Sequence, residues 1–430
     1  MARELNFDDP GFEAAFRHLL SEKRESAADV DAAVAAIIAD VRKRGDAALA
    51  EHTRRFDGHD RLEVTRAEID EAADSCPAAT LDALTLAAER IEAFHRRQKP
   101  DDLDIVDAQG VRMGWRWTPV AAAGLYVPGG TAAYPSSLLM NAIPAKVAGV
   151  DRIAMAVPAP DGALNPLVLA AARLAGVDEV WRIGGAQAIA AFAYGTASVR
   201  AVDKVVGPGN AYVAAAKRQV FGTVGIDMIA GPSEILVLAD GDNDPDWIAA
   251  DLLSQAEHDP VAQSILITDD AAFAKRVIAA VAAQLKTLPR AAIAGESWRT
   301  YGAVILVPNL DVAIPLIDRI APEHIELAIA EPAHFATRIR NAGAIFLGRY
   351  TPEAVGDYLG GPNHVLPTAR SARFSSGLGV MDFMKRTTIL GCDAESLRAI
   401  GPAAVTLAQA EGLGAHARSV ALRLNLPDIP

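Results

Sequence analysis

Apolar positions recur with the period of a helix in the early part of the chain and with the period of a strand after it. Over 30–41 the apolar residues follow the 3.6-residue period of an amphipathic helix. Ser26 and Asp29 precede this run in the arrangement of a capping box. A second long helix is predicted over 79–98, so the segment 1–110 is expected to be helical.

A different pattern begins at residue 111, where apolar and polar residues alternate with the period of two that a strand requires. In 111–240 further strands are predicted at 123–127, 153–157, 180–183, 204–206 and 235–238. In 241–348 strands are predicted at 264–268, 303–307 and 344–347, with helices at 245–258, 271–286 and 311–320. This alternation predicts the α/β class, with two doubly wound, Rossmann-like domains and parallel-rich sheets. Ligands of such sheets gather at the carboxyl ends of the strands.

The remaining segment, 349–430, begins with a loop region rich in glycine and aromatic residues. Helices are predicted after it, near 393–411 and 415–424. The segment is too small for a third sheet domain, so we expect an appendage or an arm that reaches a partner subunit.

Composition and charge narrow the class of protein. The chain has 430 residues, of which 51% are hydrophobic and 22% charged, as is usual for a soluble globular protein of two or three domains. The net charge of -13 argues against nucleic acid or an anionic membrane as a partner. There are two cysteines and no CxxC pair, no apolar run long enough to cross a membrane, and no secretory signal at the N-terminus. We expect a cytoplasmic protein.

Three glycine-rich turns follow predicted strands of the first α/β stretch: GLYVPGG (124–130), RIGGAQ (182–187) and VGPGNAYV (206–213). Small residues there let a pyrophosphate approach backbone amides at a helix N-terminus. Tyr126, Gln187 and Asn210 are placed to contact such a ligand. None of the turns fits G-x-G-x-x-G, because Tyr212 stands where the third glycine is required. Ordinary turn glycines therefore remain the alternative.

The motif LLSQAEHDP places Gln255 and His258 three residues apart at the end of a predicted helix. Residues at this spacing share one helix face, so an amide oxygen and an imidazole nitrogen could bind one cation. The alternative is the polar end of a surface helix.

Downstream motifs add acid–base groups. In APEHIEL, Glu323 and His324 follow a predicted helix, and from a loop they could share general-base work. The alternative is a surface Glu-His dipeptide. GDYLGGPNHVLP offers Asp357 and His364, and EGLGAHA offers Glu411 and His416. Spacing alone does not select which of these groups bind metal, and the HExxH and GxSxG signatures of common hydrolases are missing.

Eight motifs in one order give the chain a resemblance to a known family. They are YVPGGTAAYPSS, GGAQAIAA, GPGNAYV, GPSE, LLSQAEHD, APEHIEL, GDYLGGPNHVLPT and EGLGAHA. Each is weak alone, but together they cover nearly the whole chain, which resembles histidinol dehydrogenase. The resemblance implies an enzyme that oxidises L-histidinol to L-histidine through a bound aldehyde, in two successive NAD-dependent hydride transfers at the end of histidine biosynthesis.

The resemblance also implies roles for individual residues. Glu323 and His324 would be the catalytic bases, and Tyr126, Gln187 and Asn210 would contact NAD. One zinc ion per subunit would be held by Gln255, His258, Asp357 and His416. The substrate would be surrounded by Ser233, Gln255, His258, His324, Asp357, His364, Glu411 and His416. A homodimer with shared active sites is implied, in which Glu411 and His416 serve the other chain. The segments 111–240 and 241–348 would then be the NAD-contacting domain and the domain of zinc and catalytic residues.

Two other functions stay open. A related zinc- and NAD-dependent dehydrogenase could act on another small alcohol, because a fold does not fix its substrate. Glu411 and His364 favour the imidazole-bearing amino alcohol, since they lie in motifs that would meet the substrate. A non-catalytic zinc-binding protein would have no need of the pair Glu323 and His324.

Overall fold

The chain forms two compact units, which are described separately. The computed structural model describes residues 2–21, 28–129, 134–229 and 231–427. The main unit comprises Met1–Gln98 and Ala121–Phe383, and the small unit comprises Lys99–Val120 and Met384–Pro430. Ser26 of the predicted capping box lies outside the described residues.

The first sheet of the main unit has six strands in the order β2-β7-β6-β5-β8-β9, all parallel except β2. These are β2 (Glu63–Val64), β7 (Glu179–Trp181), β6 (Arg152–Ala156), β5 (Ala122–Tyr126), β8 (Lys204–Val206) and β9 (Gly225–Ile226). One apolar cluster joins the sheet to α2 (Ala28–Arg44), α3 (Asp46–Asp57), α8 (Gly185–Tyr194) and α9 (Ala211–Val220). A second helical group consists of α4 (Arg66–Asp74), α5 (Ala78–His95), α6 (Pro135–Ala148) and α7 (Pro166–Ala175).

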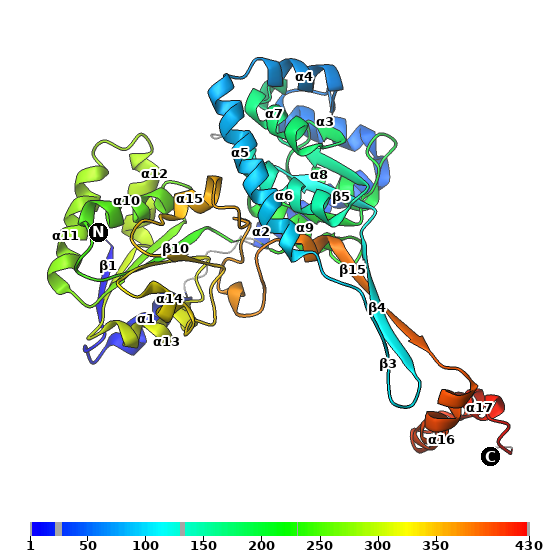
Figure 1. Cartoon of the computed structure of the whole chain (residues 1–430). Coiled ribbons are helices and arrows are strands. Elements are labelled where there is room, and N and C mark those ends of the chain that lie inside the picture. The colour runs from blue at the N-terminus through cyan, green and yellow to red at the C-terminus, as the bar shows by residue number, and fades with distance from the viewer. Residues whose placement is uncertain (1, 22–27, 130–133, 230, 428–430) are drawn as a thin grey trace. The chain divides into compact units, whose positions relative to one another are not determined.

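The second sheet also has six strands, all parallel, in the order β1-β12-β11-β10-β13-β14. These are β1 (Arg3–Asn6), β12 (Ala303–Leu306), β11 (Gln263–Thr268), β10 (Glu234–Ala239), β13 (His324–Ala328) and β14 (Ala344–Leu347). On one face pack α1 (Phe12–Ser21), α13 (Ala313–Ile320) and α14 (Pro332–Ala336). On the other pack α10 (Pro245–Ala256), α11 (Ala271–Gln284) and α12 (Ala291–Thr300), as Figure 1 shows. The predicted fold class, two doubly wound parallel-rich sheets, is confirmed.

Three details differ from the prediction. The strand expected at 235–238 as the last of the first α/β stretch is β10, which pairs with β11 and β13 in the second sheet. A loop was expected around His324, but His324 begins the strand β13. All residues of β13 are buried, and the polar Glu326 among them interrupts the apolar pattern of a buried strand. The segment 1–110, expected to be helical, contributes the edge strand β1 to the second sheet. Because β13 is buried along its whole length, it lacks the alternation by which a strand is recognised.

The small unit consists of a three-stranded antiparallel sheet and two helices (Figure 1). Its strands are β3 (Leu103–Val106), β4 (Arg112–Pro119) and β15 (Met384–Gly391), and its helices are α16 (Ala394–Ala410) and α17 (Gly414–Arg423). The two helices confirm the prediction, whereas β15 lies where loop was expected. Large apolar side chains stay exposed on this unit, namely Val106, Leu390, Leu407 and Leu422.

The rest of the main unit is made of short elements. They are α15 (Glu353–Tyr358) and the 3₁₀ turns η1 (Arg96–Gln98), η2 (Pro160–Gly162), η3 (Leu310–Val312), η4 (Ser371–Arg373) and η5 (Val380–Phe383). No helix in the described part of the chain has both the length and the apolar character that crossing a bilayer requires.

Candidate functional site

The residues expected to perform catalysis lie at the amino ends of strands in the second sheet. His324 begins β13 and Ser233 directly precedes β10, and these two strands are parallel neighbours. Gln255 lies in the last turn of α10, the helix that precedes β11. The α/β rule had predicted ligands at the carboxyl ends. In this sheet the predicted residues lie at the opposite end.

His324 is a buried imidazole with one nitrogen bonded and the other free. Its Nδ1 lies 3.0 Å from the carbonyl oxygen of Glu234, to which it donates a hydrogen bond. This bond leaves a lone pair on Nε2, which is buried and has no hydrogen-bond partner among the described residues. Burial lowers the pKa of His324 to about 4. The neutral ring can therefore accept a proton at Nε2.

Glu323 is bound by Glu234 of β10, the residue that also binds His324. Its Oε2 accepts a hydrogen bond from the backbone N–H of Glu234 at 2.8 Å. Burial raises the pKa of Glu323 well above its ordinary value, although the Glu234 amide opposes this shift. The two peptide groups of Glu234 thus orient both members of the Glu323–His324 pair.

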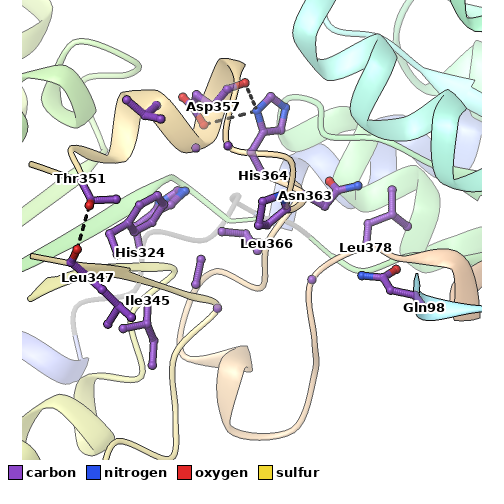
Figure 2. Close-up of a pocket in the computed structure, with 18 residues that line it drawn as sticks. Gln98, His324, Ile345, Leu347, Thr351, Asp357, Asn363, His364, Leu366 and Leu378 are labelled. Atoms are coloured by element: carbon purple, nitrogen blue, oxygen red, sulfur yellow. Dashed lines mark hydrogen bonds and ion pairs between the residues drawn. The ribbon is translucent and has the colours of Figure 1, made fainter. Parts of the chain in front are cut away.

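Asp357 and His364 come from the loop region after β14 and contact each other, as Figure 2 shows. Asp357 lies in α15, and its carbonyl oxygen and Oδ1 lie 3.0 and 3.3 Å from Nδ1 of His364. Nε2 of His364 lies 3.2 Å from the hydroxyl oxygen of Ser137 on α6. Burial raises the pKa of Asp357, but the hydrogen bond and charge of His364 outweigh it, and the pKa falls to about 2. The carboxylate is thus ionised at neutral pH.

Gln255 and His258 lie together at the end of α10, as predicted from their spacing. Nε2 of Gln255 is 3.2 Å from Nδ1 of His258. The side chain of Gln255 is 1% exposed, and its Oε1 is buried without a hydrogen-bond partner in the described structure. An orphaned buried oxygen beside an imidazole fits a cation ligand, because a buried acceptor otherwise needs a donor.

Glu353 belongs to the site and was missed from the sequence. Oxygen and nitrogen atoms of His324, Glu353 and Asp357 lie within 4.8 Å of one another, close enough to hold a metal ion. Glu353 is 2% exposed, and its Oε1 lies 3.7 Å from Nε2 of His324. Burial, and then the charge of Asp357, raise its pKa to about 9. Recognising α15 as a helix would have placed Glu353 and Asp357 on one face.

A cavity of about 560 Å³ opens at this cluster. Its wall includes His324, Asp357 and His364, together with apolar residues of β14 and of the loop after α15 (Figure 2). The volume is in the range of small-molecule sites. The cluster therefore faces a space that a small polar substrate could enter.

The residues expected to contact NAD lie at the carboxyl ends of strands in the first sheet. Tyr126 ends β5, and its hydroxyl oxygen accepts a hydrogen bond from the N–H of Gly185 at 3.0 Å. Gln187 is buried in the first turn of α8. Asn210 caps α9, and its side-chain oxygen accepts hydrogen bonds from the N–H groups of Tyr212 and Val213.

These elements meet at the point where the strand order reverses, between β5 and β8. Nucleotides bind at such switch points, where helix N-termini carry partial positive charge. The first sheet therefore fits a pyrophosphate ligand, without the usual glycine fingerprint.

Glu411 and His416 belong to the small unit. Glu411 directly follows α16, His416 is in α17, and both are exposed.

Comparisons with known proteins agree over the whole chain. The family model described as histidinol dehydrogenase matches residues 20–424. The chain is 66% identical to histidinol dehydrogenase of Rhizobium meliloti (strain 1021) and 65% identical to that of Rhodospirillum rubrum, with 99% of each chain covered. The crystal structure of histidinol dehydrogenase from Elizabethkingia anophelis superposes with a TM-score of 0.94 at 35% identity, covering 99% of this chain and 98% of that one. The chain is therefore a dehydrogenase and belongs to the histidinol dehydrogenase family.

Proposed function

We propose that this enzyme oxidises L-histidinol to L-histidine through a bound aldehyde, in two successive NAD-dependent hydride transfers. The observation that carries the proposal is the buried, neutral His324, whose free Nε2 faces the carboxylate cluster beside the cavity. The relatives named above support histidinol as the substrate over another small alcohol or a non-catalytic role.

His324 would act as base in both oxidations. In the first, Nε2 would take the hydroxyl proton of the alcohol, and bound NAD would supply the acceptor for the hydride of the same carbon. Because Nδ1 donates to the Glu234 carbonyl, the ring is held in the tautomer that leaves Nε2 free to accept. Because the pKa of His324 is low, Nε2 would release this proton to solvent. In the second oxidation it would take a hydroxyl proton of the hydrated aldehyde, and a second molecule of NAD would supply the hydride acceptor.

Glu323 would remove a proton from the water that adds to the aldehyde. Its bond to the Glu234 amide fixes the carboxyl group close to His324, with Nδ1 and Oε2 3.7 Å apart. Burial raises the pKa of Glu323, which makes its carboxylate a stronger base, and the acid so formed would return the proton to the alkoxide oxygen of the hydrate.

Zinc fits the polar groups of this site. The orphaned oxygen of Gln255, the imidazole of His258 and the ionised Asp357 would hold the ion, together with His416. When bound, zinc supplies a Lewis acid that orients the substrate's imidazole and amine. NAD would bind the first sheet through Tyr126, Gln187 and Asn210, where two helix N-termini meet.

A homodimer would complete each active site. The small unit exposes large apolar side chains on its sheet and on both helices, more than so small a unit can shield by itself. A second copy that covers them would bring its Glu411 and His416 to this chain's site. A cytoplasmic location suits Cys76 and Cys392, which form no disulfide.

The test is NADH formation from L-histidinol, with and without prior treatment by a chelator. We expect two NADH per histidinol, activity lost on chelation, and activity restored by zinc. A protein that retains zinc but does not oxidise histidinol would contradict the substrate assignment, and a panel of small alcohols would then identify the related activity.

A further inference from the structure

The turn after β8 has a backbone conformation that requires glycine. Gly207 has a φ of +111°, and a Cβ atom there would lie 2.1 Å from the carbonyl oxygen of Tyr126. The turn continues to Asn210, which caps α9. Gly207 thus links the end of β5 to the N-terminus of α9, at the switch point of the first sheet.

Two buried charged side chains bind both peptide groups of Gly207. Its N–H donates to Oδ2 of Asp227 at 2.8 Å, and its carbonyl oxygen accepts from Nζ of Lys217 at 3.0 Å. Lys217 and Asp227 also form an ion pair, and each side chain is 1% exposed. The three residues therefore form a closed ring of polar contacts inside the protein.

Stability alone does not account for this ring. Removing two charges from water costs several kcal/mol per ion, and apolar residues of similar volume are often as stable or more so. The ring does, however, satisfy two buried peptide groups that the strained turn leaves outside any helix or sheet. Its specific effect is to fix the conformation of the turn.

The ring also ties together the elements around the turn. Lys217 lies in α9, about two turns beyond its capping residue Asn210, and Asp227 directly follows β9. Movement of Gly207 would therefore displace the cap and the first amides of α9. These are the groups proposed above to face the cofactor.

We infer that Lys217 and Asp227 are positioning residues for the cofactor turn, which set the affinity for NAD through Gly207 without touching the nucleotide. The inference rests on the proposed NAD site of the first sheet. It assigns to this ion pair a role in cofactor binding rather than in catalysis or in zinc binding.

The experiment compares NAD binding by the zinc-loaded protein in variants of the ring. Lys217→Met and Asp227→Asn should each raise the Kd for NAD by roughly ten- to a hundredfold, because the turn is then no longer held in the conformation that binds the cofactor. The KM for NAD should rise in parallel, while kcat at saturating NAD and bound zinc change little. Arg218→Met changes the next residue of α9 and removes an exposed ion pair with Asp31 of α2, so it should leave the Kd unchanged.

The double variant Lys217→Met with Asp227→Leu separates positioning from stability. Apolar replacements remove the unpaired buried charge of each single variant, so they should recover part of the lost thermal stability. They cannot bind Gly207, so NAD affinity should stay low. Affinity that returns together with stability, or single variants that bind NAD like the wild type, would overturn the inference. Wild-type protein that does not bind NAD would contradict the cofactor assignment itself and this inference with it.

Discussion

The two sheets of the main unit share one architecture and offer opposite ends to their candidate ligands. In the first sheet the candidate residues follow the strands, and backbone groups of glycine turns form much of the site. In the second sheet Ser233, Glu323 and His324 lie at the amino ends of β10 and β13, and buried side chains form the site. The same fold can therefore carry two kinds of site, depending on which end is used.

Helix electrostatics explain the division. In a βαβ unit the helix N-terminus lies at the carboxyl end of the strands and carries partial positive charge, which suits a pyrophosphate. The helix C-terminus lies at the amino end and carries partial negative charge, which suits a cation. Gln255 and His258 stand at the C-terminal end of α10, whereas Gln187 and Asn210 stand at the N-termini of α8 and α9.

The largest expected effect is that of His324→Asn, which should impair the site of the second sheet and leave the site of the first sheet intact. Loss of the free Nε2 should lower turnover of histidinol by roughly 10²- to 10⁴-fold, the usual contribution of a general base. Zinc content and NAD affinity should stay near normal, as metal analysis and NAD titration would show. His334→Asn, at an exposed position of α14, should leave turnover unchanged. Zinc lost together with activity would make His324 a ligand rather than a base.

Asp357→Ala should weaken the second-sheet site in a different way. Loss of the ionised carboxylate should reduce bound zinc by roughly tenfold or more, while NAD affinity at the first sheet persists. The matched control is Asp259→Ala, which removes an exposed carboxylate beside His258. An unchanged zinc content of Asp357→Ala would exclude it from the coordination set.

Gly207→Ala should impair the first sheet alone. The added Cβ would approach the Tyr126 carbonyl, and positive φ costs about 1–3 kcal/mol in a non-glycine residue. We expect weaker NAD binding and a lower melting temperature with normal zinc content. Gly222→Ala bears the same backbone strain at φ +100° but meets open space, so its NAD affinity should be normal. If the two variants bound NAD with equal affinity, the conformation of Gly207 would have no specific role in NAD binding.

The smallest expected effect concerns His324, whose ring should not titrate in the pH range of an ordinary histidine. Because burial lowers the pKa of His324 to about 4, its ring should stay neutral from pH 8 to about pH 5, where an ordinary histidine becomes charged. The unfolded chain takes up that proton near pH 6.5, so the stability linked to His324 falls as the pH drops from about 6.5 to about 4. Histidine-selective ¹⁵N NMR at a series of pH values measures the protonation of the His324 ring. The His324 signal is the one that is missing from the spectrum of His324→Asn. A midpoint near 6.5 would contradict the burial effect.

The sequence predicted the α/β class, the long helices and most strands, because periodic patterns and glycine turns are local signals. It did not predict β13, whose pattern is a continuous buried run interrupted by Glu326. Glu353 was missed because its place beside His324 depends on the loop after β14, which no local pattern describes. Spacing grouped Gln255 with His258, but the contacts of Glu234 with Glu323 and His324 arise only from strand pairing.

The pairing of β4 with β15 has a consequence for synthesis in the cell. Residues 384–391 pair in register with residues 112–119, and most of the main unit lies between these strands in the sequence. At elongation rates of about 5–20 residues per second, β4 emerges from the ribosome on the order of tens of seconds before its main partner. Until then it can pair only with β3, and a two-stranded hairpin is marginally stable in water. Until residues 384–391 have been synthesised, the nascent hairpin therefore leaves the β15-facing edge of β4, with Trp115 and Trp117, unpaired.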